Sequence, residues 1–242
     1  MTAQLRVFEM GGYAAGYAGR LFLRAGADVV RLASEVEQPA WVSGQAMQLY
    51  LHAGKRRVAG LDQQQIDRLI AAADVVVCEV ACADELEAVR AQLAGKYAVV
   101  ISPFGLTGPK RNWHATPSTL LAMGGYTYLI GDADKAPLNL PGHYLEFQAA
   151  TLGYAAVNAA RLAAQPELID VSMFETLMSM SQFTTVRWHC AGSIRTRHGS
   201  DFWFVSPSDL FRCADGWVYI NIVPAFWDAF LVFIEQPELV IQ

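Results

Sequence analysis

The feature that most constrains the fold is an alternation of strand-like and helix-like segments with glycines at the turns. Residues 5–8 form a strand-like run, a glycine-rich turn follows at 11–16, and residues 17–24 have the apolar spacing of a helix that ends before Gly26. Residues 27–32 return as a strand. This order of strand, turn, helix and strand predicts a parallel sheet with a right-handed crossover.

The same alternation recurs further along the chain. Helices are expected at 64–73 and 84–93, and strands at 75–77 and 97–102. We therefore predict an α/β fold, a Rossmann-like open parallel sheet with helices on both faces. The hydrophobic content of 53% supports a substantial core. No apolar run approaches the ~20 residues that span a bilayer, so no membrane association is expected.

The second half of the chain changes character twice. Residues 148–164 predict a helix of small side chains that packs closely against a second helix or a partner chain. An Asp-Gly pair at 215–216 between alternating residues predicts a hairpin. We expect a large domain at 1–191 and an incomplete, smaller β-containing domain at 192–242.

Charge and cysteine usage limit the partners and the compartment. A net charge of -5 offers no basic field for a phosphate backbone, so no nucleic acid is expected. The four cysteines form no Cys-x-x-Cys pair and the N-terminus has no signal-like segment, which favours a cytoplasmic location. His52, His189 and His198 lack metal-ligand spacing, so no metal is expected.

Two carboxylates bracket the small-residue helix, and both are candidate nucleophiles. Glu146 lies in a Gly-His-Tyr-Leu-Glu loop expected ahead of the helix; alternatively it is a surface acid near a helix N-terminus. Asp170 follows the helix. Ser172 and Glu175 have the spacing of a capping box just after Asp170, which favours a structural role for that acid.

The glycine turn and a cationic cluster each allow two interpretations. The turn at 11–16 does not match Gly-x-Gly-x-x-Gly, and it fits a tight turn as well as a ligand-facing loop. Lys55, Arg56 and Arg57 fit a solvated face as well as a phosphate site.

Six segments share an order and spacing that together indicate a family: 16–21 (Gly-Tyr-Ala-Gly-Arg-Leu), 26–30 (Gly-Ala-Asp-Val-Val), 54–56 (Gly-Lys-Arg), 73–77 (Ala-Asp-Val-Val-Val), 102–109 (Ser-Pro-Phe-Gly-Leu-Thr-Gly-Pro) and 169–173 (Ile-Asp-Val-Ser-Met). In this series the chain resembles the class III CoA-transferases, the CaiB/BaiF family that includes formyl-CoA and carnitine CoA-transferases. The Phe-Gly-x-Thr-Gly-Pro turn is the most specific of them.

The resemblance implies a function and an assembly. The substrates would be an acyl-CoA, with coenzyme A as the group transferred, and a carboxylic acid, with no tightly bound cofactor. The protein would form a homodimer of interlocked chains or pair with a complementing subunit. Family members are longer, so the resemblance also implies that the C-terminal part of the small domain lies beyond Gln242.

The resemblance further assigns site residues. The family nucleophile is an Asp just ahead of the small-residue helix, and Glu146 stands at that position. Its carboxylate would carry the acyl group and then CoA through anhydride and thioester intermediates. Coenzyme A would bind residues at the first turn, the cationic cluster and the later turn: Tyr13, Ala14, Ala15, Lys55, Arg56, Phe104 and Gly105.

The chain departs from the family at two segments that usually help to hold the CoA nucleotide. Ala33 and Ser34 replace an acidic residue and an Arg, and residues 78–83 (Cys-Glu-Val-Ala-Cys-Ala) replace Glu-Asn-Phe-x-Pro-Gly.

Two alternatives to CoA transfer remain open. One is an acyl-CoA racemase-like proton transfer, in which His143 or His114 would work with Glu146 as base and acid. The other is a non-catalytic CoA-transferase-like subunit that keeps the fold and the dimer surface. For the acyl group, Tyr126, Tyr128, Trp203 and Phe204 are either pocket or core residues.

Overall fold

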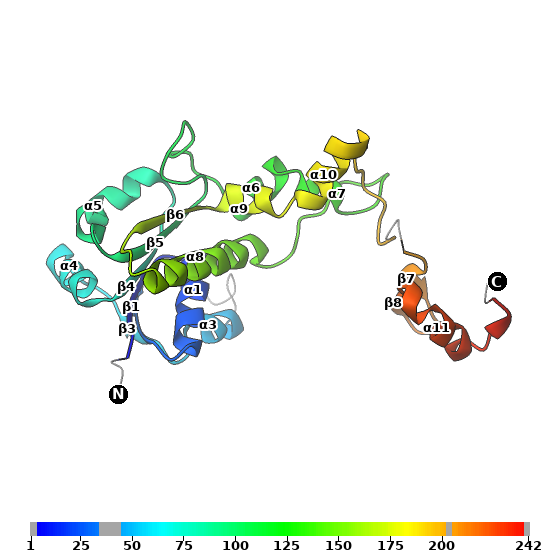
Figure 1. Ribbon diagram of the computed structural model, residues 1–242, viewed down its shortest axis with the longest axis horizontal. Helices are drawn as coiled ribbons and strands as arrows, with labels where there is room; N and C mark the ends of the chain where they lie inside the picture. The colour runs from blue at the N-terminus through cyan, green and yellow to red at the C-terminus, as the bar shows by residue number, and fades with distance from the viewer. Residues whose placement is uncertain (1–3, 34–44, 202–204, 240–242) are drawn as a thin grey trace. The chain divides into compact units, whose positions relative to one another are not determined.

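Strand order is the feature of the fold that positions a site. The computed structural model describes residues 4–33, 45–201 and 205–239 (Figure 1), so the expectations for Ser34, Trp203 and Phe204 lie outside it. Six strands form one sheet in the order β3-β2-β1-β4-β5-β6, and every neighbouring pair is parallel. The strands are β1 (Arg6–Met10), β2 (Asp28–Leu32), β3 (Arg56–Val58), β4 (Val75–Glu79), β5 (Tyr97–Ser102) and β6 (Leu168–Ser172).

The strand order reverses direction between β1 and β4. In an open α/β sheet this reversal leaves a crevice at the carboxyl ends of the two strands, where ligands bind. Met10 pairs with Cys78 at that edge, so Gly11 and Glu79 come next to each other there. A Cβ on Gly11, whose φ is +127°, would lie 2.5 Å from the Glu79 Cβ. Only glycine allows so close an approach.

Helices cover both faces of the sheet, which confirms the predicted fold class (Figure 1). On one face, Phe8, Val76 and Val100 pack with Ile70, Leu86 and other residues of α4 (Gln63–Ala72) and of the region of α5 (Glu87–Arg90). On the other face lie α1 (Tyr13–Arg24) and α8 (Tyr144–Leu162). Because successive strand side chains point to opposite faces, the near-continuous apolar runs of β4 and β5 serve both layers.

The remaining helical elements of the described chain are short. They are α3 (Gln45–His52), α6 (Pro117–Met123), α7 (Tyr126–Leu129), α9 (Met173–Ser179), α10 (Gln182–Ala191) and α11 (Trp227–Phe233), with 3-10 turns at Ala83–Leu86, Ala91–Leu93, Pro224–Phe226 and Pro237–Leu239. The predicted single helix at 84–93 is wrong in detail, because only its middle turn is α-helical.

Two helices begin earlier than the sequence pattern predicts. α1 begins at Tyr13, directly after the N-cap Gly12, so the first-turn residues are helical rather than part of the loop. α8 begins at Tyr144, so Glu146 lies in the first helical turn and not in a loop ahead of it. In both cases the helix begins at the residue that directly follows a glycine or histidine whose backbone is not helical.

The chain divides into two compact units. Unit 1 comprises 1–124 and 140–193, and unit 2 comprises 125–139 and 194–242. Within unit 2, Arg197 donates hydrogen bonds to the carbonyl oxygens of Tyr128 and Asp132, at 2.9 and 3.2 Å, which ties its two segments together. The predicted domains 1–191 and 192–242 stay a prediction.

Unit 2 contains the predicted hairpin. β7 (Ser208–Arg212) and β8 (Trp217–Asn221) pair antiparallel, and the turn between them closes with a hydrogen bond from the Cys213 N–H to the Gly216 carbonyl. The Asp-Gly pair therefore lies in the turn of a hairpin, as the sequence pattern predicts.

Candidate active site

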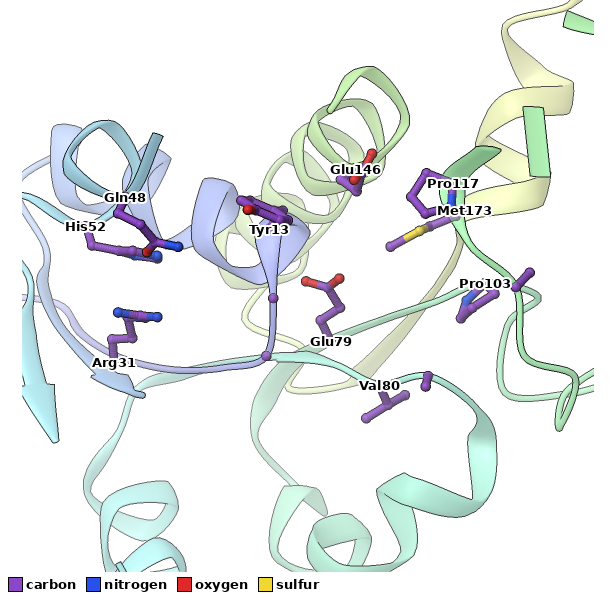
Figure 2. A pocket seen from close by; sticks show the side chains of 14 residues that line it. Tyr13, Arg31, Gln48, His52, Glu79, Val80, Pro103, Pro117, Glu146 and Met173 are labelled. Carbon is purple, nitrogen blue, oxygen red and sulfur yellow. The ribbon is translucent and has the colours of Figure 1, made fainter. Parts of the chain in front are cut away.

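A cavity of about 440 Å³ lies in unit 1 at the carboxyl ends of β1 and β4. Figure 2 shows the side chains that line it. They come from the turn after β1, from strands and the loops that follow them, and from five helices: Gly11, Gly12, Tyr13, Arg31, Gln48, His52, Glu79, Val80, Ala81, Pro103, Ala115, Pro117, Glu146 and Met173. The cavity therefore occupies the crevice that the strand order creates.

Glu146 reaches this cavity from the first turn of α8. The residue is only 5% exposed, and its Oε1 lies 2.9 Å from His143 Nδ1. Its Oε2 has no hydrogen-bond partner among the residues that the structure describes. A buried carboxylate oxygen without a partner is costly unless a ligand or water meets it, so this oxygen is available for chemistry.

Aromatic stacking between α1 and α8 holds the Glu146 region in place. The Tyr13 ring stacks on the His143 ring with centroids 3.8 Å apart. One turn further along, Tyr17 stacks on Phe147 at 4.2 Å. His143 is thus fixed both by a ring and by the carboxylate, which restricts the rotamers of Glu146.

Glu79 is a second acid in the same cavity, at the end of β4. Its Oε2 accepts a hydrogen bond from the Ala15 N–H at 2.9 Å, so the carboxyl group occupies the N-terminus of α1. Burial raises the pKa of Glu79, and the negative charge of Glu146 raises it further, while the amides of Ala15, Ala14 and Gly12 lower it in part. The balance of these effects favours the neutral form of Glu79.

A buried polar network lies beside the cavity. Lys55 Nζ is 2.5 Å from Glu9 Oε2 and 2.6 Å from the Gly16 carbonyl oxygen, and both charged side chains are 1% exposed. Burial raises the pKa of Glu9 to about 7 even though Lys55 opposes the shift. Burial and the positive charges of Arg31 and Lys55 lower the pKa of His52 to about 3, so His52 is neutral at physiological pH. Arg31 and His52 line the cavity, and Lys55 does not.

The residues expected to hold coenzyme A are only partly brought together. Tyr13 lines the cavity, and Ala14 and Ala15 are fully buried in the first turn of α1. Lys55 is engaged by Glu9, and Arg56 forms an exposed ion pair with Asp28, with Nη2 2.5 Å from Oδ2.

The predicted site residues on the later turn lie outside the cavity lining. Phe104 packs edge to face against Trp113, and Gly105 lies next to Asp170. Asp170 is on β6 and accepts a hydrogen bond from the Leu106 N–H at 2.9 Å. Its observed contact therefore anchors the 103–109 turn. Ser172 does cap α9, by accepting a hydrogen bond from the Glu175 N–H.

The two histidines expected to serve racemisation lie in different surroundings. His143 forms the pair with Glu146 described above, while the His114 side chain is exposed and is not among the lining residues. Tyr126 and Tyr128 lie on α7 in unit 2.

Sequence reasoning missed Glu79, Arg31 and Gln48 as cavity residues. Glu79 was visible only as part of a departure from the family pattern. Its position as the last residue of a buried strand was the available signal, because ligands meet open α/β sheets at strand carboxyl ends.

Neither a metal-binding cluster nor a membrane-spanning helix occurs in the described parts of the chain. Residues 4–33, 45–201 and 205–239 contain no group of three His, Cys, Asp or Glu side chains arranged to hold a metal ion. No helix in these ranges combines the length and apolarity of a membrane span.

The known proteins to which this chain is similar include CoA-transferases. The family model described as CoA-transferase family III matches residues 3–242. The chain is 27% identical, over 263 residues, to succinyl-CoA:(R)-benzylsuccinate CoA-transferase subunit BbsE of Thauera aromatica, covering 96% of this chain and 63% of that protein. It is 26% identical to succinyl-CoA–D-citramalate CoA-transferase of Chloroflexus aurantiacus, covering 90% of this chain and 60% of that protein.

Solved structures share the fold. A CaiB/BaiF family protein from Brucella suis superposes with a TM-score of 0.81 at 20% identity, covering 97% of this chain and 70% of that one. Rv3272 from Mycobacterium tuberculosis gives 0.72 at 22% identity, covering 98% and 68%. The chain thus spans about 63% of the length of BbsE and 60% of the citramalate enzyme.

Proposed function

Because the chain belongs to CoA-transferase family III, we propose that it moves coenzyme A from an acyl-CoA donor to a carboxylic acid through Glu146. The observation that carries the proposal is the unpartnered Oε2 of a buried carboxylate in a cavity at the strand-order reversal. Burial strips water from this oxygen, which favours attack on a carbonyl carbon over solvation.

The proposed reaction needs no net proton. A Glu146 oxygen bonds to the thioester carbonyl carbon, the C–S bond breaks, and CoA leaves as a thiolate from a mixed anhydride. The thiolate then attacks the Glu146 acyl carbon, which releases the donor acid as a carboxylate and leaves a Glu146–CoA thioester. The acceptor carboxylate attacks that thioester, which gives a second mixed anhydride and releases the CoA thiolate. The thiolate then attacks the acyl carbon of the acceptor, so that the new acyl-CoA forms and the Glu146 carboxylate is regenerated.

The longer side chain of Glu, compared with the family's Asp, requires compensation. A displacement of about one ångström in the attacking atom can cost ~100-fold in rate. Placement of Glu146 within the first helical turn, and its contact with His143, limit where the extra methylene can move. These restraints support a reactive Glu rather than a relic.

The donor that we propose is succinyl-CoA. The relatives from Thauera and Chloroflexus, and a mesaconate CoA-transferase from Haloarcula marismortui, all carry succinyl-CoA in their names. A succinyl group brings a free carboxylate, and Arg31 contributes a cation to the cavity lining. The protein would work in the cytoplasm, as a homodimer or with a complementing chain.

A second candidate function is that of a partner subunit without its own turnover. Two observations favour it: the relative from Thauera is named as a subunit, and the Lys55 ammonium expected for phosphates is neutralised internally. Isothermal calorimetry with CoA separates the candidates. A folded protein that binds no CoA supports the partner role.

Acylation of Glu146 tests the leading proposal. The protein is incubated with succinyl-CoA, quenched with hydroxylamine, which converts a Glu thioester to a hydroxamate, and digested for mass spectrometry. We expect modification of the peptide that contains Glu146 and none in Glu146→Gln. Glu175→Gln is the matched control, because Glu175 holds the same position in the first turn of α9 but is exposed.

Three outcomes would count against transfer through Glu146. They are an unmodified wild-type peptide, modification that persists in Glu146→Gln, and loss of modification in Glu175→Gln. Incubation in D2O adds a further check, because deuterium at the α-carbon without acylation would favour the racemase-like use of the His143–Glu146 pair.

A further inference from the structure

The cavity contains two carboxyl groups that approach it from different elements. Figure 2 shows both beside Tyr13, with Glu146 carried by α8 and Glu79 by the end of β4. Two carboxylates that share a partly dry site do not both ionise readily, because each charge raises the energy of the other. The mechanism proposed above uses Glu146 as an anion and assigns nothing to Glu79.

The surroundings of Glu79 decide which acid keeps the proton. Burial and the Glu146 charge both raise the pKa of Glu79, which favours the neutral form of this acid. The groups that act on Glu79 are the amides of Gly12, Ala14 and Ala15 on α1, Glu146 on α8 and Glu9 on β1; Arg31 of β2 and His52 of α3 line the same cavity. The other lining residues on this side, Pro103, Ala115, Pro117 and Met173, carry no charge.

Glu79 is also held in a fixed position. Its Oε2 accepts the Ala15 N–H, and a Cβ at Gly12 would come within 3.1 Å of its Oε1. The carboxyl group is therefore seated against the turn between β1 and α1, and when protonated it has one O–H to donate. A donor that is rigid before the reaction costs no reorganisation when charge develops.

We propose that Glu79 is a catalytic acid that stays neutral and donates its O–H to the carbonyl oxygen of the thioester while Glu146 attacks. This inference rests on the proposed CoA transfer. As the Glu146 oxygen bonds to the carbonyl carbon, the C=O electron pair moves to oxygen, and the resulting oxyanion accepts the Glu79 hydrogen bond. The C=O then re-forms and the C–S bond breaks to release the thiolate. The proton remains on Glu79 throughout.

The test compares Glu79→Gln and Glu79→Ala with the wild-type protein over a pH range. The measured quantity is the rate of Glu146 acylation by succinyl-CoA in a rapid-quench experiment. As the pH rises through the pKa of Glu79, the wild-type protein loses its donor, so its rate should fall on the order of tenfold per pH unit above that pKa. Gln keeps an N–H donor that does not titrate, so Glu79→Gln should lack this fall.

The Glu79→Ala variant tests the complete loss of the hydrogen-bond donor. Glu79→Ala should lose about 100-fold or more in acylation rate at every pH, as loss of an oxyanion donor does elsewhere. The ratio of the wild-type rate to the Glu79→Gln rate at each pH isolates the contribution of Glu79. Glu175→Gln serves again as the control with an unchanged profile.

The outcomes distinguish failure of the Glu79 role from failure of CoA transfer through Glu146. A wild-type protein that acylates Glu146 with the same pH profile as Glu79→Gln overturns the role of Glu79 alone, as does Glu79→Ala at the wild-type rate. A wild-type protein that never acylates Glu146 overturns both proposals. If Glu79→Ala does not fold, the pH comparison with Glu79→Gln still decides.

Discussion

Lys55 and Arg56 are neighbours in the chain whose charges have different energetic weight. Lys55 Nζ contacts Glu9 at 2.5 Å with both side chains 1% exposed, while the Arg56 and Asp28 side chains are 66% and 32% exposed. Breaking a buried pair leaves an uncompensated charge in a medium that solvates it poorly, whereas water screens an exposed pair.

We therefore expect Lys55→Met to lower the free energy of unfolding by ~3–5 kcal/mol at pH 8, where Glu9 is ionised. Arg56→Met should cost no more than about 1 kcal/mol. Urea denaturation of the two variants measures both values. The double variant Glu9→Met/Lys55→Met should recover most of the loss, and equal costs for the two single variants would contradict a buried pair.

At the scale of the element, α8 depends on a contact that only a small side chain allows. A Cβ on Gly153 would lie 2.7 Å from Val99 Cγ2 on β5. Val has a stiff χ1, so it has little freedom to move away. The small residues of 148–164 predict close packing against a second helix or a partner chain, and α8 packs against α1 as well as the sheet.

Gly153→Ala should be destabilising despite the higher helix propensity of Ala. Propensity favours the variant by about 1 kcal/mol, but overpacking in a rigid core costs ~1–3 kcal/mol, so we expect a net loss. Thr151→Ala on the exposed side of the same helix should change stability by less than about 0.5 kcal/mol. In Gly153→Ala/Val99→Ala the penalty should be smaller than the sum of the single variants; additive penalties would show that the two positions do not meet.

At the scale of the whole molecule, buried carboxyl groups set the pH dependence of stability. The pKa of Glu9 is about 7 in the folded protein against an ordinary 4.5, so the folded state binds its proton more tightly than the unfolded state. The stabilisation that this proton provides is fully present below about pH 4.5 and is lost as the pH rises to about 7.

The difference in the free energy of unfolding between the wild-type protein and Glu9→Gln isolates the contribution of the Glu9 proton. The stability of the wild-type protein relative to the variant should fall by about 3 kcal/mol between pH 4.5 and 7, measured by urea denaturation at each pH. Asp74 gives the opposite sign: the side-chain hydrogen bond from Arg6 lowers its pKa, so stability relative to Asp74→Asn should be lost as the pH falls through the acid range. A flat difference for Glu9→Gln would mean that Glu9 is ionised throughout.

The sequence alone determined the fold class and the family, because both are recorded in local patterns. Apolar runs and glycine turns mark the strands and crossovers, and the Asp-Gly pair marks the hairpin. Each of these patterns involves residues that are close together in the chain, so it can be recognised in the sequence without the tertiary structure.

Only the tertiary structure decided which charged groups are available to a ligand. The sequence made Lys55 a candidate phosphate ligand, but its ammonium group pairs with the carboxylate of Glu9 on β1. Glu79 and Glu146 are far apart in the sequence, and the strand order brings them to one cavity. Burial and partners set the protonation and reactivity of a side chain, and both come from long-range packing that no local pattern records.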